Sequence, residues 1–179
     1  MRYVALLRGV NVGGKNKIAM SELREAFEKQ GFSDVVTYIN SGNILFSSDL
    51  DATRIKALCE EMISKRFGLA VVVGIITAEN LIEAIKNAPS WWGAGPDYKH
   101  NALFVIPPMT PEQVIEEVGR AKPEYEQVGS FGNVIFWSAP LATFSHSRWS
   151  KIVQNKKAYN AVTIRNANTA KKLARLAED

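Results

Sequence analysis

The strongest constraint on the fold of this chain is an internal repeat: similar sequence segments occur in the same order in its first and second halves. Gly42-Asn43-Ile44-Leu45-Phe46 aligns with Gly132-Asn133-Val134-Ile135-Phe136 at an offset of 90 residues. Thr77-Ala78 with Leu81 reappears as Thr169-Ala170 with Leu173 at an offset of 92, at the predicted start of the closing helix of each half. These two agreements in register indicate an internal duplication.

The first half has a predicted order of strand, helix, strand, strand, helix, strand and helix. Runs of apolar, β-branched and aromatic residues predict its four strands at 2–7, 35–39, 44–46 and 69–76. Helical spacing of apolar residues predicts helices that begin near Ser21, Asp51 and Thr77. Ser21 and Thr77 can cap their helices, and the helix from Asp51 has acids at its start.

The second half repeats this order. Its strands are predicted at 102–106, 125–128, 134–137 and 162–164. Thr110-Pro111-Glu112-Gln113 is a capping box with proline at the first helical position, so a helix begins there. Trp149, Ile152 and Val153 predict the next helix, and a last helix is expected from Thr169 onward.

These observations predict an α+β fold of two tandem ferredoxin-like (split βαβ) repeats with antiparallel sheets, each ending in an additional helix. The turn-forming stretch 89–96, with Trp91 and Trp92 inside it, marks the boundary, so the domains are expected at 1–90 and 97–179. We expect the tryptophans to pack between the halves, and a cleft to lie there as well.

Composition excludes several classes of protein. Apolar residues make up 46% and charged residues 22% of the chain, which is typical of globular domains and not of disordered ones. The apolar run 69–76 is too short to cross a membrane, and no secretory signal precedes it, so we expect a cytoplasmic protein. Cys59 has no second cysteine, and with His100 and His146 it forms no metal-ligand spacing, so neither a metal nor a cofactor is predicted.

The net charge of +4 is modest, but the charges are unevenly distributed. No acidic residue precedes Glu22, and none lies between Glu126 and Glu178, where eight lysines and arginines occur. If folding brings these segments together, their field would attract a phosphate, a carboxylate or a nucleic-acid backbone. The alternative is a solvated basic surface without a ligand.

The segment from Gly9 to Lys15 matches the G-x-x-x-x-G-K spacing of a phosphate-binding P-loop. Asn16 occupies the position where a serine or threonine would hold Mg²⁺, which argues against nucleoside triphosphate hydrolysis. Gly13 and Gly14 allow backbone conformations in which amides surround an anion, with Arg8 and Lys15 adding charge. The alternative is a tight connection that the glycines merely allow to turn.

Three blocks of sequence resemble a bacterial family, domain-of-unknown-function family DUF1697. They are Ala5 to Gly14, Thr37 to Asn43, and Thr163 to Thr169 with Lys172 and Leu173. The resemblance implies a pair of ferredoxin-like repeats and brings no established activity, catalytic residue or cofactor. This chain departs from the family pattern at Asn40, where glutamine is usual, and at Ala167, where tryptophan is usual.

The polar residues of these blocks are amides, hydroxyls and cations, without an acid or base suited to catalysis. We therefore expect a binding protein for an anionic small molecule, phosphorylated or carboxylated, that binds in the cleft between the two halves. The predicted ligand-binding residues are Arg8, Asn11, Gly13, Gly14, Lys15, Ser41, Asn43, Arg165, Asn166 and Asn168. Nucleic-acid binding through the basic segment 148–175 is the second choice, and an uncharacterised enzyme the third. Cys59 is expected to be inert, and the Ser41 hydroxyl to bond within its own turn.

Overall fold

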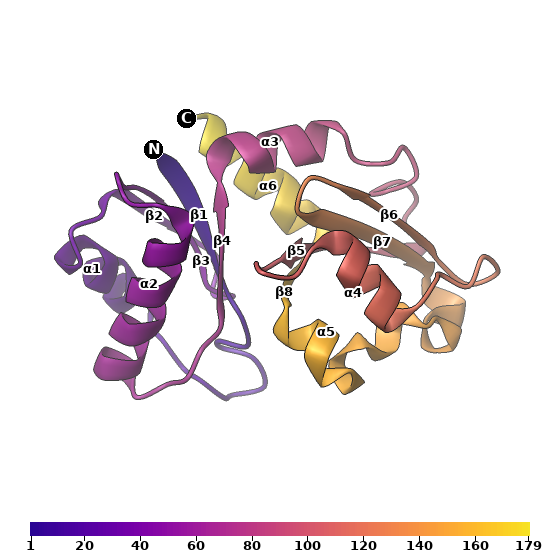
Figure 1. Cartoon of the computed structure of the whole chain (residues 1–179), viewed down its shortest axis with the longest axis horizontal. Coiled ribbons are helices and arrows are strands. Elements are labelled where there is room, and N and C mark those ends of the chain that lie inside the picture. Colours follow the sequence, from indigo (N-terminus) through magenta and orange to yellow (C-terminus); the bar gives the residue numbers. More distant parts are fainter. The chain divides into compact units, whose positions relative to one another are not determined.

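The computed structural model describes residues 1–179 and divides into two compact units (Figure 1). Unit 1 comprises residues 1–82 and 173–179, and unit 2 comprises residues 83–172. Each unit contains a four-stranded antiparallel sheet with helices, which confirms the predicted α+β class in two repeats. The limits of the division fall inside the two closing helices, and the expected domains 1–90 and 97–179 stay a prediction.

Unit 1 is built from four strands and two complete helices. They follow in the order β1 (Arg2–Leu7), α1 (Met20–Lys29), β2 (Ser33–Tyr38), β3 (Asn43–Ser47), α2 (Ala52–Phe67) and β4 (Val73–Thr77), after which α3 (Ala78–Lys86) begins. The strand order in the sheet is β2-β3-β1-β4, and all neighbours are antiparallel. β1 therefore lies at the centre, paired with β3 on one side and β4 on the other.

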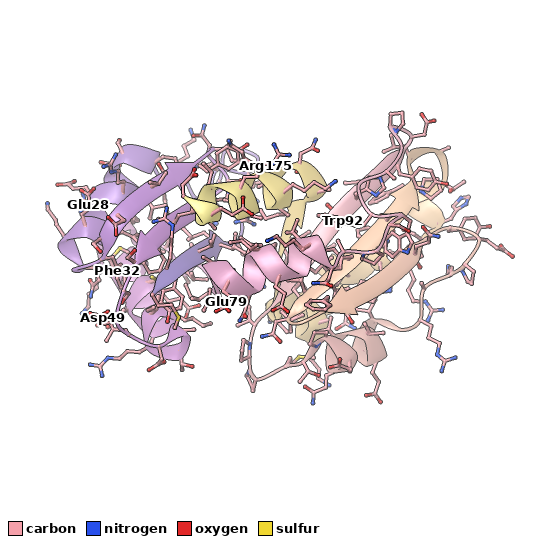
Figure 2. All side chains as sticks on the ribbon, turned by 90° about the horizontal axis from the view of Figure 1, so that it is seen from above. Glu28, Phe32, Asp49, Glu79, Trp92 and Arg175 are labelled. Atoms are coloured by element: carbon pink, nitrogen blue, oxygen red, sulfur yellow. The ribbon has the colours of Figure 1, made fainter.

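An aromatic cluster forms the core between this sheet and its helices. Phe46 on β3 lies 5.3 Å from Phe27 on α1 and 4.7 Å from Phe32, measured between ring centroids (Figure 2). Ile55 and Cys59 on α2 belong to the same buried cluster, so α1 and α2 cover one face of the sheet. Rings at these separations add to the free energy gained from burying apolar surface.

Unit 2 repeats the arrangement with a different third segment. Its elements are β5 (Tyr98–Val105), α4 (Pro111–Val118), β6 (Gln127–Phe131), β7 (Val134–Pro140), the 3₁₀ helices η1 (Leu141–His146) and η2 (Trp149–Gln154), α5 (Lys156–Asn160) and β8 (Val162–Asn166), after which α6 (Ala167–Glu178) begins. The strand order β6-β7-β5-β8 places β5 at the centre, as β1 is in unit 1. The capping box at Thr110 is present as predicted.

The helix predicted around Trp149, Ile152 and Val153 is present as the 3₁₀ helix η2 and not as one continuous α-helix. The short α5 begins only after Asn155, whose backbone is extended. Asn155 Oδ1 accepts a hydrogen bond of 3.1 Å from the Ala158 amide, which starts a new helix instead of continuing the old one. Val153 is 56% exposed, so it is not part of a buried stripe.

A buried carboxylate determines where η2 begins. Glu126 is 3% exposed, and its Oε1 accepts hydrogen bonds from the backbone amides of Lys122 (3.0 Å) and Arg148 (2.9 Å). Its Oε2 accepts a further bond of 3.0 Å from the Trp149 amide. One side chain therefore satisfies three backbone donors from two segments, and it fixes the start of η2 next to the loop that follows α4.

The starts of two helices also differ from the prediction. α1 begins at Met20, and the residue before it, Ala19, supplies no side-chain cap, so Ser21 is not the cap. α6 begins at Ala167 because Asn166 Oδ1 accepts a 2.8 Å bond from the Thr169 amide. Thr77 has the equivalent role before α3, where its Oγ1 accepts from the Asn80 amide. The capping positions are thus 89 residues apart, and the alignment of Thr77 with Thr169 is wrong.

The stretch 89–96 packs within unit 2. Trp92 is 4% exposed, and its indole Nε1 donates a 2.8 Å hydrogen bond to the Asn101 carbonyl oxygen (Figure 2). Its ring meets Phe136 edge-on with 4.9 Å between centroids. The Lys171 ammonium lies 5.4 Å from the same ring, a cation–π distance. Trp92 therefore attaches the segment before β5 to the sheet of unit 2.

We expect a Gly→Ala substitution to destabilise the protein by different amounts in the two copies of the repeated Gly-Asn turn. Gly42 has a φ of +79°, and a Cβ there would lie 2.6 Å from Val10 Cγ2 and 2.7 Å from Leu7 Cβ. Gly132 has a φ of +54° with open space around it. We expect Gly42→Ala to lower the free energy of unfolding by about 2–4 kcal/mol, and Gly132→Ala by about 1 kcal/mol, in urea titrations. Equal losses in the two variants would contradict this account.

The Glu126 bonds generate a second prediction. In Glu126→Gln an amide NH₂ replaces one carboxylate oxygen and faces at least one backbone donor. We expect a loss of about 1–3 kcal/mol in the free energy of unfolding, measured in urea. Glu124→Gln is the matched control, because Glu124 is exposed and lies only two residues away. The account fails if the two variants are equally stable.

Candidate functional site

The loop after β1 folds back on itself. The Lys15 amide donates a 3.0 Å hydrogen bond to the Val12 carbonyl oxygen, and the Asn11 amide donates one of 3.1 Å to that of Asn16. Gly13 and Gly14, the two residues between Val12 and Lys15, have φ values of +57° and +75°. Positive φ at both central residues is what a type I′ turn requires, so the glycines make a small hairpin.

The P-loop spacing does not lead into a helix here. α1 starts five residues after Lys15, and the hairpin tip is exposed to solvent. Asn11 joins the base of this loop to its surroundings: its Oδ1 accepts from the Ile18 amide, and its Nδ2 donates to the carbonyl oxygens of Ile18 (2.9 Å) and Asn40 (2.8 Å). The Asn11 side chain thus holds the loop in place.

A concavity of about 420 Å³, here called the loop pocket, lies between this loop and the start of α1. It is lined by Asn11, Gly14, Lys17, Ile18, Ala19, Met20 and Asn40. No carboxylate lines it, and the first amides of a helix have no acceptor within the helix. Two predicted residues, Asn11 and Gly14, therefore share a pocket with a cation that was not predicted, Lys17.

The other predicted residues of unit 1 lie in or beside the turns that join its strands. Asn43 is fully buried, and its Nδ2 donates to the Tyr38 carbonyl oxygen (3.0 Å) and to Ser41 Oγ (2.9 Å). The backbone amide of Arg8 donates to the Val72 carbonyl oxygen at 3.0 Å. The two bonds that the Asn43 side chain donates give this residue a structural role in the β2–β3 turn.

Arg165 on β8 is 8% exposed, which is unusual for an arginine. Its Nη1 donates a 2.8 Å hydrogen bond to the Ile164 carbonyl oxygen. Burial lowers the pKa of the Arg165 guanidinium to about 10, because the charged form loses hydration. The group still carries its charge at neutral pH.

A larger concavity in unit 2, of about 720 Å³, is here called the α6 pocket. Its lining consists of Gly93, Gly95, Pro96, Tyr98, Lys99, His100, Leu141, Asn166, Ala167 and Asn168. Asn166 and Asn168, both predicted, meet there at the start of α6. Lys99 and His100 come from β5, and the lining contains no carboxylate.

His100 has hydrogen-bond partners on both ring nitrogens. Nδ1 is bonded to Ser138 Oγ, and Nε2 lies 3.4 Å from the Gly95 carbonyl oxygen. The Tyr98 ring stacks on the imidazole with 6.0 Å between centroids. Ser138 and His100 thus form a hydroxyl–imidazole pair, but Ser138 is 1% exposed, which keeps its hydroxyl away from a substrate.

Sequence reasoning missed the cations of both pockets, Lys17 and Lys99, and the aromatic Tyr98. Lys17 lies two residues beyond the predicted Lys15 and outside the family blocks, and Tyr98 and Lys99 lie before the predicted strand 102–106, in a segment without a recognised motif. The remaining predicted residues, Gly13, Lys15, Ser41 and Arg165 among them, do not line these two pockets.

The single cysteine generates a prediction about reactivity. Cys59 is fully buried on α2, and burial, followed by the charge of Glu60, raises the pKa of its thiol to about 12. Almost no thiolate forms at mildly alkaline pH, so we expect Ellman's reagent to leave the native protein unmodified. In concentrated guanidinium chloride it should release one equivalent per chain. Rapid modification of the native protein would contradict the burial of Cys59.

No helix of the chain combines the length and the apolar character needed to cross a membrane. No curated protein matches the sequence. Among solved structures, the conserved bacterial protein SP0830 from Streptococcus pneumoniae is similar, with 29% sequence identity and a TM-score of 0.87. The match covers 99% of this chain and 98% of that protein, so the whole two-repeat fold is shared.

An unknown protein from Galdieria sulphuraria matches over 92% of this chain and 95% of its own, but with 12% identity and a TM-score of 0.26 it carries no argument. A family model described as protein of unknown function (DUF1697) matches residues 1–136. That match includes the β1 loop, the β2–β3 turn and the β6–β7 turn. The chain therefore belongs to the DUF1697 family.

Proposed function

We propose that this protein binds an anionic small molecule, phosphorylated or carboxylated, in the α6 pocket of unit 2. One observation carries the proposal: the pocket combines Asn166, Asn168, Lys99 and His100 and is lined by no acidic residue. A volume of about 720 Å³ is within the range of small-molecule sites. The family itself has no established function.

The start of α6 supplies the attraction for an anion. The backbone amides of the first helical turn lack acceptors within the helix, and the helix dipole adds a partial positive charge there. One of these amides, that of Thr169, donates its hydrogen bond to the Asn166 side-chain oxygen. Asn168 is exposed in the same turn, where its side-chain NH₂ can donate to a ligand.

Tyr98 and Lys99 on β5 also line the pocket. The Lys99 ammonium lies 4.5 Å from the centroid of the Phe144 ring, which restricts the position of this cation. Tyr98 is 44% exposed and offers an aromatic ring beside the charged groups. A ligand with one acidic group and an apolar or sugar portion fits this combination better than a bare ion does.

We also infer that each repeat is ferredoxin-like, within domains at 1–90 and 97–179. The strand orders β2-β3-β1-β4 and β6-β7-β5-β8 support this, because the first and third strands of each repeat pair at the centre. In unit 2, the segment η1–η2–α5 stands where α2 stands in unit 1. A cytoplasmic location remains our expectation, which rests on the sequence alone.

Nucleic-acid binding is the second candidate, favoured by the lysines and arginines that follow η1. The usual mode of RNA recognition by such sheets stacks bases on exposed aromatic rings of the central strands. Ile44, Leu45 and Phe46 on β3 are fully buried, as are their counterparts on β7. This surface therefore offers no platform for stacked bases.

An Asn168→Asp variant tests the proposal, with Asn80→Asp as its matched control. Both residues are exposed in the first turn of a closing helix, and both changes lower the net charge by one. A carboxylate near a helix N-terminus is favourable, so neither variant should lose stability without ligand. In Asn168→Asp, however, the new charge repels an anion from the pocket.

The measurement is the melting temperature with inorganic phosphate, glucose 6-phosphate and citrate at millimolar concentration. We expect at least one of them to raise the melting temperature of the unmodified protein and of Asn80→Asp by about 2 °C or more. Asn168→Asp should not respond. The proposal is wrong if none of the three has an effect, or if Asn168→Asp responds like the control.

A further inference from the structure

A second concavity in unit 2 is lined by four cations from separate segments. Lys122 follows α4, Arg148 precedes η2, Lys151 lies on η2 and Lys156 begins α5. This basic pocket has a volume of about 750 Å³, and its other lining residues are Val118, Ile152, Gln154 and Asn155. No acidic residue lines it, and it shares no residue with the α6 pocket.

The backbone that carries these cations is held by the buried Glu126 carboxylate. Glu126 accepts hydrogen bonds from the amides of both Lys122 and Arg148, so the two segments stay at a fixed separation. The Lys122 ammonium also donates a 3.1 Å bond to the His146 carbonyl oxygen. The backbone at Lys122 and Arg148 is therefore fixed before any ligand arrives, which lowers the entropic cost of binding.

Arg148 packs closely against the turn after α4. Gly119 has a φ of +99°, and its α-carbon lies so near the Arg148 guanidinium that a Cβ would collide with Nη1. Trp149 supports the same turn, because its indole Nε1 donates a 3.1 Å bond to the Gly119 carbonyl oxygen. The guanidinium is thus placed by packing while the residue remains exposed to solvent.

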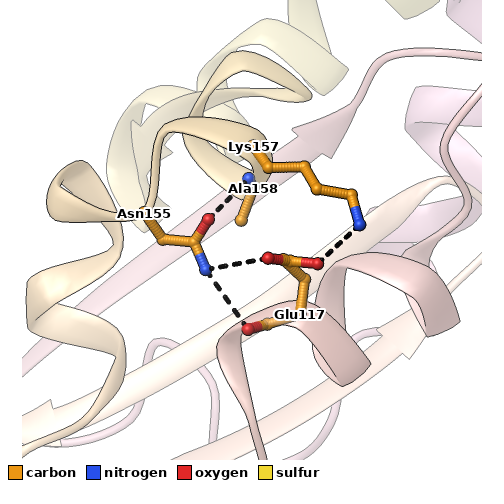
Figure 3. A network of polar contacts seen from close by, with 4 residues as sticks. All are labelled: Glu117, Asn155, Lys157 and Ala158. Atoms are coloured by element: carbon orange, nitrogen blue, oxygen red, sulfur yellow. Dashed lines mark hydrogen bonds and ion pairs between the residues drawn. The ribbon is translucent and has the colours of Figure 1, made fainter.

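Glu117 on α4 contacts Asn155, a lining residue of the basic pocket, but its carboxylate is already engaged. Glu117 Oε2 accepts from the Lys157 ammonium at 2.7 Å, and the Asn155 side-chain NH₂ donates to the Glu117 carbonyl oxygen at 3.2 Å (Figure 3). The hydrogen bond from the Lys157 ammonium, together with its charge, lowers the pKa of the Glu117 carboxyl, so the carboxylate stays ionised and paired. In contrast, Lys122, Arg148, Lys151 and Lys156 have no carboxylate within 4.0 Å.

We propose that the basic pocket binds an oligophosphate, a ligand with two or three linked phosphates. Four like charges around one concavity repel one another until an anion with several charges enters. The planar guanidinium of Arg148 can donate two parallel hydrogen bonds to one phosphate, and the lysines act as point charges on its neighbours. The lining contains no aromatic ring, so the phosphates and not a stacked base carry the recognition.

The proposal is independent of the function proposed for the α6 pocket, because the two pockets have no residue in common. An Arg148→Gln/Lys151→Gln double variant tests it. Both residues are exposed and take part in no ion pair, so the variant should fold as the unmodified protein does. The matched control is Arg54→Gln/Lys86→Gln on α2 and α3, which removes the same charges from exposed positions that also take part in no ion pair.

Isothermal titration calorimetry with sodium tripolyphosphate and with inorganic phosphate measures the affinity, and Asn168→Asp is titrated alongside. We expect tripolyphosphate to bind the unmodified protein, Asn168→Asp and the control with equal dissociation constants, and phosphate to bind at least tenfold more weakly. The Arg148→Gln/Lys151→Gln variant should bind tripolyphosphate at least tenfold more weakly than the control does.

A single-stranded dT12 oligonucleotide forms the third arm of the titration. The proposal is overturned if tripolyphosphate fails to bind, if the pocket variant and the control bind it equally, or if only the oligonucleotide binds and requires Arg148 and Lys151. The last result would assign the surface to a nucleic-acid backbone, whose affinity falls steeply with added salt. Loss of tripolyphosphate binding in Asn168→Asp would also contradict the assignment to this pocket.

Discussion

The pairing of one central strand on both of its edges is the constraint from which the rest of each repeat follows. β1 is hydrogen-bonded to β3 and β4, and β5 to β7 and β8, with continuous antiparallel registers. A register shift of one residue would turn every buried side chain of these strands to the other face. The ends of the central strands therefore define where the β1 loop leaves the sheet of unit 1 and where the start of α6 meets β5 in unit 2.

The helices and strands that were predicted correctly share a strong local signal. α2 has apolar residues at helical spacing, an aspartate cap at Asp51 and a glycine stop at Gly68, while α4 has a complete capping box. The helix starts at α1 and α6 differ from the prediction for local reasons, whereas around η2 a side chain distant in sequence competes with the local pattern. Glu126 captures the amides at the start of η2 from more than twenty residues away, and no periodicity reveals such a bond.

The candidate site was predictable in its chemistry but not in its geometry. The family blocks are rich in asparagine, and sequence alone does not distinguish an amide that binds a ligand from one that holds the chain. The side chains of Asn11 and Asn43 donate hydrogen bonds to backbone carbonyl oxygens of unit 1, whereas Asn168 is exposed at a pocket. The acid-free segment after Glu126, in turn, indicated three of the four cations of the basic pocket, Arg148, Lys151 and Lys156, without showing that they surround one concavity with Lys122.

The two Gly-Asn turns show that duplicated segments can differ in how well they tolerate an amino-acid substitution. Around Gly42 the chain has closed in, with Val10 and Leu7 filling the space that a side chain would need. Around Gly132 the equivalent space is open. A side chain added at the β6–β7 turn of the second repeat therefore costs less folding free energy than one added at the β2–β3 turn of the first. New binding specificity can arise more easily at the turn of the second repeat.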